Sequence, residues 1–175
     1  MSSPVVIRDV EWEDFRQHTR NFLSYYDEVK KNPDLGILVG GKKPKMTEEV
    51  EWFAGFYKRL LVGDAVASLA ECDGKVVGMC DINRTVLRED VRHKGAMGIA
   101  ILKDYRNMGI GTKLVKSCIK KARGRFEIIT LSAFSSNKAA LGLYEKCGFR
   151  RYGVGKRFIK RNGKYLDEVF LCLEL

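Results

Sequence analysis

Two dipeptides that favour tight hairpin turns, Asp73-Gly74 and Asn162-Gly163, constrain the fold of this chain more than any other sequence feature. Each lies between runs rich in β-branched or aromatic residues, and Asx-Gly is the strongest short-range signal for a two-residue β-hairpin. The strands that flank the two turns are expected at residues 65–71 and 75–84, and at 149–159 and 165–173. The chain therefore contains at least two antiparallel strand pairs.

The rest of the chain alternates between helical and extended patterns. Apolar residues spaced three and four apart predict helices at 14–30, from 47 onward, at 112–123 and at 137–146. Thr47 is expected to cap the second of these helices. Short apolar runs predict further strands at 5–10, 97–102 and 126–132, and the glycine- and proline-rich stretch 31–46 is expected to be a loop.

The element order β-α-α-β-β-β-α-β-α-β-β predicts an α/β fold, a mixed twisted sheet of about seven strands flanked by four helices. With 175 residues, of which 45% are hydrophobic, the chain is expected to form one domain over residues 1–175. No apolar run approaches the roughly 20 residues of a membrane span, and the N-terminus does not resemble a signal peptide. A cytoplasmic protein is therefore expected.

Cysteine and histidine give no sign of a disulfide framework or a metal site. The five cysteines form no C-x-x-C pair and lie among apolar neighbours, and there are only two histidines, His18 and His93. The net charge of +10 is the main departure from an average composition. It makes a nucleic acid, an anionic membrane or a phosphate-rich cofactor a plausible partner, and a basic surface that only maintains solubility is the alternative.

A glycine-containing segment between an expected strand and helix predicts an anion site. Residues 106–112 read Arg-Asn-Met-Gly-Ile-Gly-Thr, and Gly109 and Gly111 allow backbone N–H groups to converge on a ligand. The positive end of the following helix points to the same place. Leu114 stands where a dinucleotide fingerprint would have its third glycine, so that motif is absent. A tight strand–helix turn without a ligand is the alternative.

A second motif helps to interpret the segment 106–112. Residues 137–149 read Asn-Lys-Ala-Ala-Leu-Gly-Leu-Tyr-Glu-Lys-Cys-Gly-Phe, one strand and one helix after the first motif. Arg-x-x-Gly-x-Gly followed by Asn-x-x-Ala and Leu-Tyr-Glu-Lys-x-Gly-Phe resembles the GNAT superfamily of acetyl-CoA-dependent N-acetyltransferases. The resemblance covers residues 64–175. Arg92-His93 and the late Gly-Lys-Tyr-Leu-Asp-Glu segment look most like amino-acid or small-amine acetyltransferases.

The resemblance implies that acetyl-CoA is the co-substrate and that no metal is needed. Its pantetheine arm would pair with a strand edge, at the backbone of Ile99, Ala100 and Ile101. The glycine loop would hold the pyrophosphate with Arg106, Asn107, Met108, Gly109, Ile110, Gly111 and Thr112. Asn137 matches the asparagine that bonds the cofactor, and it could equally be a helix N-cap.

The resemblance also assigns catalytic roles. Tyr144 matches the tyrosine that serves the leaving sulfur, with core packing as the alternative. The general base is less defined, because Gly95 and Ala96 stand where several relatives have a carboxylate. Where ribosomal-protein alanine acetyltransferases have a glutamate, this chain has Ser132.

Three side chains are candidates for the missing base. His93 is the nearest, and its ordinary pKa of about 6.5 suits a base at neutral pH. Asp81 and Asp167 are alternatives, as is a chain of water molecules with no single base.

Substrate selection is expected to lie around the 31–46 loop. Asp27, Glu28, Glu48 and Glu49 could attract a cationic amine, or could be ordinary helix-surface acids.

The leading hypothesis is N-acetylation of a small amine or amino acid. Acetylation of a protein N-terminus or lysine is the second hypothesis, and a non-catalytic basic module that binds RNA or ribosomes is the third. No membrane partner is expected, and the last hairpin could provide an edge for a homodimer.

Overall fold

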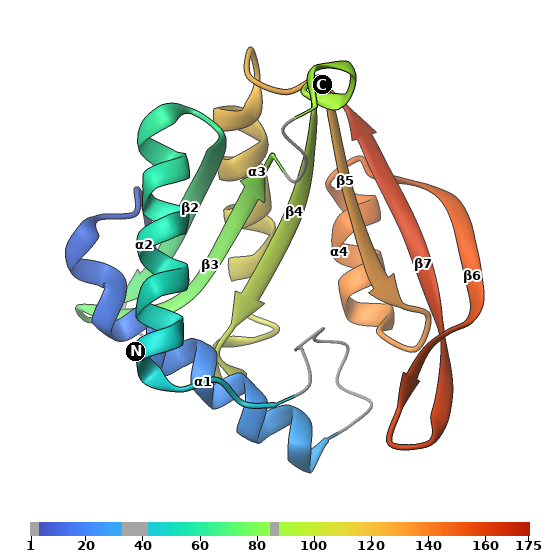
Figure 1. The fold of residues 1–175 in the computed structure, drawn as a ribbon, viewed down its shortest axis with the longest axis horizontal. Coiled ribbons are helices and arrows are strands. Elements are labelled where there is room, and N and C mark those ends of the chain that lie inside the picture. The colour runs from blue at the N-terminus through green and yellow to red at the C-terminus, as the bar shows by residue number, and fades with distance from the viewer. Residues whose placement is uncertain (1–3, 33–41, 85–87) are drawn as a thin grey trace.

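The computed structural model describes residues 4–32, 42–84 and 88–175. In these ranges one mixed sheet runs in the order β1-β2-β3-β4-β5-β7-β6 (Figure 1). Its strands are β1 Val6–Arg8, β2 Ala65–Cys72, β3 Lys75–Asn83, β4 Lys94–Ile101, β5 Ile128–Phe134, β6 Arg150–Arg161 and β7 Lys164–Glu174. The helices are α1 Phe15–Lys31, α2 Met46–Val62, α3 Ile110–Ala122 and α4 Lys138–Lys146. Short 3-10 turns lie at Trp12–Asp14, Glu89–Val91 and Lys103–Tyr105. The predicted α/β fold is confirmed.

The helices cover the two faces of the sheet unequally. α3 and α4 pack on one face, over a core that includes Leu114, Ile129 and Leu171. α1 and α2 lie on the other face, and Phe53 and Phe56 of α2 are fully buried there. Figure 1 shows α1 and α2 over the β1–β4 half of the sheet, without reaching over β5, β7 and β6. Within the described ranges, one face of the β5-β7-β6 half therefore has no helix packed on it.

Both predicted hairpins are present, and their turns have the backbone shape that the sequence demands. Asp73 and Gly74 have φ values of 52° and 70°, and Asn162 and Gly163 have 49° and 77°. Two successive left-handed residues define the hairpin turn that matches the twist of the flanking strands. The turns thus fix the β2–β3 and β6–β7 pairs.

The centre of the sheet opens between β4 and β5. These strands run parallel and pair only at Lys94–Ala96 with Ile128–Thr130. Beyond Ala96, β4 continues along β3 to Ile101, whereas β5 continues along β7 to Phe134. The two strands diverge in Figure 1, so the later half of β4 has a strand partner on one side only.

Several predicted boundaries are wrong for local reasons. The N-cap of α2 is Lys45 rather than Thr47, because the Glu48 carboxylate accepts the Lys45 N–H at 2.6 Å. β4 begins at Lys94 rather than at residue 97, because Lys94, Gly95 and Ala96 pair with β5 through their backbone, and these residues lack the large apolar side chains that mark a strand in the sequence. Residues 33–41 of the predicted loop lie outside the described residues.

The remaining general expectations concern membranes and thiols. Among the described residues, no helix has both the length and the apolar character needed to cross a membrane. The five cysteines, all of which lie in the described ranges, form no disulfide bond. Burial was expected for each of them, and it holds for Cys72, Cys80 and Cys118, whereas Cys147 and Cys172 are half-buried.

We predict that Gly95→Ala destabilises the protein and that Gly142→Ala does not. A Cβ at Gly95 would lie 2.5 Å from Ile82 Cγ2 and 3.0 Å from Phe126 Cδ1, whereas a Cβ at Gly142 meets nothing within 4 Å. Overpacking costs about 1–3 kcal/mol, whereas alanine in a helix gains up to about 1 kcal/mol over glycine. Urea unfolding monitored by circular dichroism measures both, and equal midpoints for the two variants would contradict the packing argument.

Candidate active site

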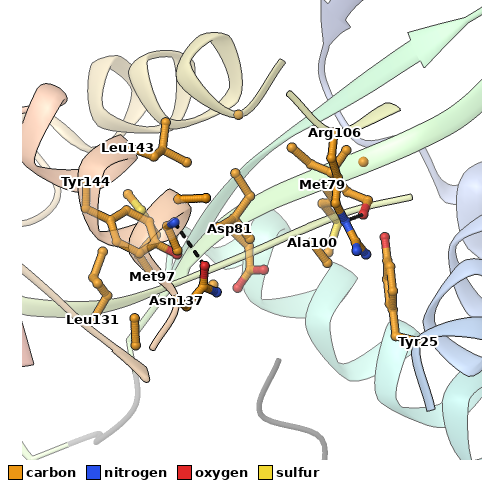
Figure 2. Close-up of a pocket in the computed structure, with 18 of the residues that line it drawn as sticks. Tyr25, Met79, Asp81, Met97, Ala100, Arg106, Leu131, Asn137, Leu143 and Tyr144 are labelled. Carbon is orange, nitrogen blue, oxygen red and sulfur yellow. Dashed lines mark hydrogen bonds between the residues drawn. The ribbon is translucent and has the colours of Figure 1, made fainter. Parts of the chain in front are cut away.

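A pocket of about 860 Å³ occupies the opening between β4 and β5. Its walls come from β3, β4 and β5, from the loop before α3, and from the start of α4. Residues of α1 and α2 close it on the opposite side. Figure 2 shows Tyr144 and Leu131 on one side of this pocket, Tyr25 and Arg106 on the other, and Asp81 between them.

The loop before α3 has a backbone that suits an anion. Asn107 and Gly109 have φ values of 60° and 76°, and Gly109 is the N-cap of α3. Left-handed residues next to a helix start turn successive N–H groups toward one point, where the helix dipole is also positive. Of the predicted loop residues, the pocket is lined by Arg106, Asn107, Gly109, Gly111 and Thr112. Met108 is exposed and Ile110 is buried in the core.

Gly111 provides space between two helices. A Cβ there would lie 3.0 Å from Cδ2 of Leu143 on α4 and 3.5 Å from Cδ1 of Ile101. Its φ is not in the left-handed region, so the requirement for glycine at this position is one of space. A side chain at residue 111 would therefore narrow the pocket between α3 and α4.

Arg106 holds the loop rather than presenting a free charge. Its two terminal nitrogens donate to Glu28 on α1 at 2.6 and 2.7 Å, and its Nε donates to the Ile101 carbonyl at 2.9 Å. Such a bidentate arginine–carboxylate pair has a strongly preferred geometry. Arg106 therefore links α1 to the end of β4, and both carboxylate oxygens of Glu28 are bonded to it.

The predicted β4 and α4 residues face the same pocket. Ile99, Ala100 and Ile101 line it, and they belong to the part of β4 that has no β5 partner. Asn137 also lines it, and its Oδ1 accepts the Ala140 N–H at 3.1 Å, as the dashed line in Figure 2 shows. The helix-capping role of Asn137 is thus present, and the residue still faces the pocket.

Tyr144 is a buried residue at the pocket wall. Its ring lies 6.0 Å from that of Phe149, in an edge-on contact that fixes its direction. Burial raises the pKa of the Tyr144 hydroxyl well above its ordinary value of 10. The hydroxyl is therefore protonated throughout the physiological range and can act as a donor.

Asp81 is the acidic group of this pocket. It lies on β3 opposite Gly98 of β4, where a Cβ would lie 3.4 Å from Asp81 Oδ1. Asn83 Nδ2 donates to Asp81 Oδ2, and Asn83 Oδ1 in turn accepts from Arg59 Nε at 3.2 Å. Burial raises the pKa of Asp81 from 3.8 to about 7, against the opposing effects of Arg59 and Asn83. This carboxyl can therefore accept or release a proton near neutral pH.

The other base candidates lie elsewhere. His93 precedes β4 and lines a separate hollow of about 390 Å³ with Arg123 and Phe126. The carboxylate of Asp167 on β7 accepts the Arg157 N–H at 2.8 Å and the Lys156 ammonium at 2.9 Å, and these bonds lower its pKa. The structure brings Asp81 together with Tyr144, and it places His93 and Asp167 outside their pocket.

The acids expected around the acceptor have other contacts. Asp27 is exposed and pairs with Lys43 at 2.6 Å, and Glu48 caps α2. Glu49 is buried, and its Oε2 has no hydrogen-bond partner among the described residues. None of the four acidic residues suggested by the sequence lines the pocket.

The aromatic wall on the α1 and α2 side of the pocket was not predicted from the sequence. His18, Phe22, Tyr25 and Trp52 all line the pocket. His18 stacks on Trp52 with 5.5 Å between ring centroids, and burial lowers its pKa to about 4, which keeps the imidazole neutral. The spacing of residues 18, 22 and 25 marks only an apolar helix face, which does not distinguish a core from a pocket wall.

Comparison with known proteins identifies the family. The chain matches the Acetyltransferase (GNAT) family over residues 7–149. It is 31% identical over 118 residues to the L-amino acid N-acetyltransferase AaaT of Escherichia coli (strain K12), covering 66% of this chain and 72% of that protein. It is 33% identical over 112 residues to an N-alpha-acetyltransferase of Sulfurisphaera tokodaii, covering 59% of this chain and 67% of that protein.

The fold agrees with this assignment. It is similar, with a TM-score of 0.81 and 20% identity, to a GNAT superfamily phosphinothricin acetyltransferase from Sinorhizobium meliloti in complex with acetyl-CoA. That likeness covers 98% of this chain and 88% of the other. The chain therefore belongs to the GNAT acetyltransferase family, and the predicted enzyme class, an N-acetyltransferase, is confirmed.

We predict that Asp81→Asn stabilises the folded protein in a pH-dependent way. Between the unfolded pKa of 3.8 and the folded pKa of about 7, only the unfolded Asp81 is ionised, so wild-type stability falls as the pH rises. In wild type this loss of folding free energy amounts to at most about 4 kcal/mol, and it is absent from the asparagine variant, which does not ionise. Its advantage in urea unfolding is expected to be small at pH 4, to grow up to pH 7 and then to level off.

Asp27→Asn is the matched control, because Lys43 lowers the pKa of that exposed carboxyl. Its effect on stability should have the opposite sign above pH 4. A stability difference between Asp81→Asn and wild type that does not change with pH would contradict the raised pKa.

Proposed function

We propose that this N-acetyltransferase transfers the acetyl group of acetyl-CoA directly to the primary amine of a small molecule or amino acid. The observation that carries the proposal is that Asp81, with a pKa of about 7, and protonated Tyr144 line one pocket beside the glycine loop. One group can remove a proton near neutral pH, and the other can supply one. The amino-acid relative in Escherichia coli supports this acceptor class.

The co-substrate fits the open side of β4 and the loop before α3. The backbone of Ile99, Ala100 and Ile101 would pair with the pantetheine amides as an added strand would. The converging N–H groups of the loop, with the positive end of α3, would bind the pyrophosphate. The complex of the related phosphinothricin acetyltransferase with acetyl-CoA supports the same choice of co-substrate.

Asp81 takes the role of general base in this proposal, in place of His93. An ammonium has no lone pair, so the acceptor must first lose a proton, which Asp81 would accept. The amine nitrogen then attacks the thioester carbon, and a backbone N–H near Ile101 would stabilise the oxyanion. Collapse of this intermediate breaks the carbon–sulfur bond, and Tyr144 would donate a proton to the departing thiolate. The nitrogen loses its second proton as the amide forms, and that proton would return to the Tyr144 phenolate. The products are the N-acetyl amine and free CoA.

A second acceptor class, the N-terminus of a protein, is favoured by a different observation. The sheet face of β5, β7 and β6 is not covered by α1 or α2, and its residues Tyr152 and Phe170 line the pocket. A peptide could extend from the pocket across that face. The relative from Sulfurisphaera tokodaii, an N-alpha-acetyltransferase, supports this reading.

The proposal predicts release of CoA from acetyl-CoA in the presence of an amine, and a specific defect in Tyr144→Phe. The phenylalanine keeps the ring contact with Phe149 but removes the proton donor, so kcat should fall by about tenfold or more. The KM for acetyl-CoA should not change. A thiol-release assay over a panel of amines, amino acids and peptides measures both. No CoA release with any acceptor would contradict the function, and an unchanged kcat would contradict the role of Tyr144.

The base assignment predicts a distinct pH dependence. With Asp81 as base, kcat/KM should rise with pH up to about 7, because only the ionised carboxylate accepts a proton. Asp81→Asn should lower kcat/KM by about 10²- to 10⁴-fold and remove the rise of kcat/KM up to pH 7. Only the pH dependence that comes from deprotonation of the acceptor amine should then remain. His93→Gln is the control and should stay within about twofold of wild type, because His93 lines a different hollow. Loss of that rise in His93→Gln alone would reverse the assignment.

A further inference from the structure

The β6–β7 hairpin has an unusual concentration of positive charge. Between residues 150 and 164 there is no acidic residue, and the seven basic ones are Arg150, Arg151, Lys156, Arg157, Lys160, Arg161 and Lys164. All but Arg161 are exposed. Three of them form ion pairs with acids outside this stretch, at distances from 2.6 to 4.0 Å, but exposed pairs of this kind contribute little. The hairpin therefore presents a positive surface.

The same hairpin exposes large apolar side chains. Four of the eleven exposed large hydrophobic residues in the described ranges lie on it, namely Tyr152, Val154, Phe158 and Tyr165. Phe158 is 64% exposed and Tyr152 is 61% exposed. Aromatic residues together with arginine are the composition that distinguishes protein interfaces from the rest of a surface. Charge and apolar area thus coincide on one strand pair.

The backbone of β6 is strained where this surface is presented. The pairing with β7 shifts between Gly155 and Ile159, and Arg157 within that bulge has a φ of 52°, which is unfavourable for arginine. Asp167 holds the bulge by accepting from both the Arg157 N–H and the Lys156 side chain. The Phe158 ring is thereby placed 5.4 Å from that of Phe170. Strain that is held in this way is characteristic of functional segments.

This surface is continuous with the candidate active site. Phe170 contacts Phe158 on one side and lines the pocket on the other, and Tyr152 lines the pocket as well. The pocket contains the carboxylate of Asp81, whereas the hairpin outside it is basic. A ligand with an amine at its end and negative charges behind it would match both.

We propose that the β6–β7 hairpin docks acidic polypeptides, so that this enzyme acetylates protein N-termini that are followed by Asp and Glu residues. The inference rests on the proposed acetyl transfer and develops its second acceptor class, the protein N-terminus. The acidic residues lie along the basic residues of β6, and the α-amine enters the pocket toward Asp81. Nucleic acid is less suited, because the cations of Arg157 and Lys160 lie against the Tyr165 ring, at 4.2 and 5.3 Å, where a base would have to stack.

Two peptides with the same first two residues, followed either by Glu and Asp or by Gln and Asn, test the proposal. At about 0.05 M salt the acidic peptide should have a KM at least about tenfold lower, and the gap should close near 0.5 M salt, because salt screens exposed charges. Equal KM values at low salt would overturn the proposal. No turnover of either peptide, while a small amine is still acetylated, would overturn it and leave the proposed function standing.

A charge-reversed variant assigns the effect to the hairpin. Lys160→Glu with Lys164→Glu should remove or reverse the preference for the acidic peptide and leave kcat/KM for a small amine within about twofold of wild type. Lys58→Glu with Lys120→Glu is the matched control, because both lysines are exposed on other elements and the net charge changes equally. The preference should survive in this control.

Three results would contradict the assignment. These are an equal loss of preference in both double variants, a parallel loss of small-amine turnover in the hairpin variant, and displacement of the acidic peptide by a single-stranded RNA at a lower concentration than by unlabelled peptide. Fluorescence anisotropy of a labelled acidic peptide measures the last of these.

Discussion

The divergence of β4 from β5 after Ala96 is the constraint on which the site depends. Three residue pairs hold the strands together at Lys94–Ala96, and each strand then follows a different neighbour. An interior strand edge without a partner leaves backbone groups that must bond to something else. One such group, the Ile101 carbonyl, is taken by Arg106, which also binds Glu28. The same opening accommodates the glycine loop, Asn137 and Tyr144 around one pocket.

The chemistry of the pocket follows from partial burial rather than from unusual residue types. An exposed aspartate would be ionised at neutral pH and would be a weak base, whereas burial of Asp81 raises its pKa to about 7. The hydrogen-bonded link from Arg59 through Asn83 moderates this effect, so that the group stays able to ionise. The same burial keeps Tyr144 protonated and His18 neutral. Burial in one cavity thus sets the protonation states of Asp81, Tyr144 and His18. Those of Asp81 and Tyr144 suit the proposed acyl transfer.

Local features of the sequence predicted local structure well. The Asx-Gly turns, the cap by Asn137 and a helix directly after the glycine loop depend on a few neighbouring residues and are all found, although that helix begins at Ile110 rather than at the expected residue 112. Contacts between distant segments could not be predicted. Arg106 and Glu28 are 78 positions apart, so an anion-binding arginine and an amine-binding glutamate were expected where the structure has a pair. His93 was a candidate base because it is near Gly95 and Ala96 in the sequence and carries an imidazole, and only the fold shows that it lies outside the pocket.

The family motifs and the basic β6–β7 hairpin lie in different segments of the chain. The family match ends at residue 149, and β6 begins at Arg150, so the basic hairpin lies wholly beyond the matched segment. The segment that matches holds the glycine loop, Asp81 and Tyr144, the groups to which we assign acetyl transfer in our proposal. The hairpin and the aromatic wall of α1 and α2 are the surfaces that an acceptor meets next to these groups. Acceptor choice can therefore change through Tyr152, Phe158 and the lysines of β6 without disturbing the transfer chemistry.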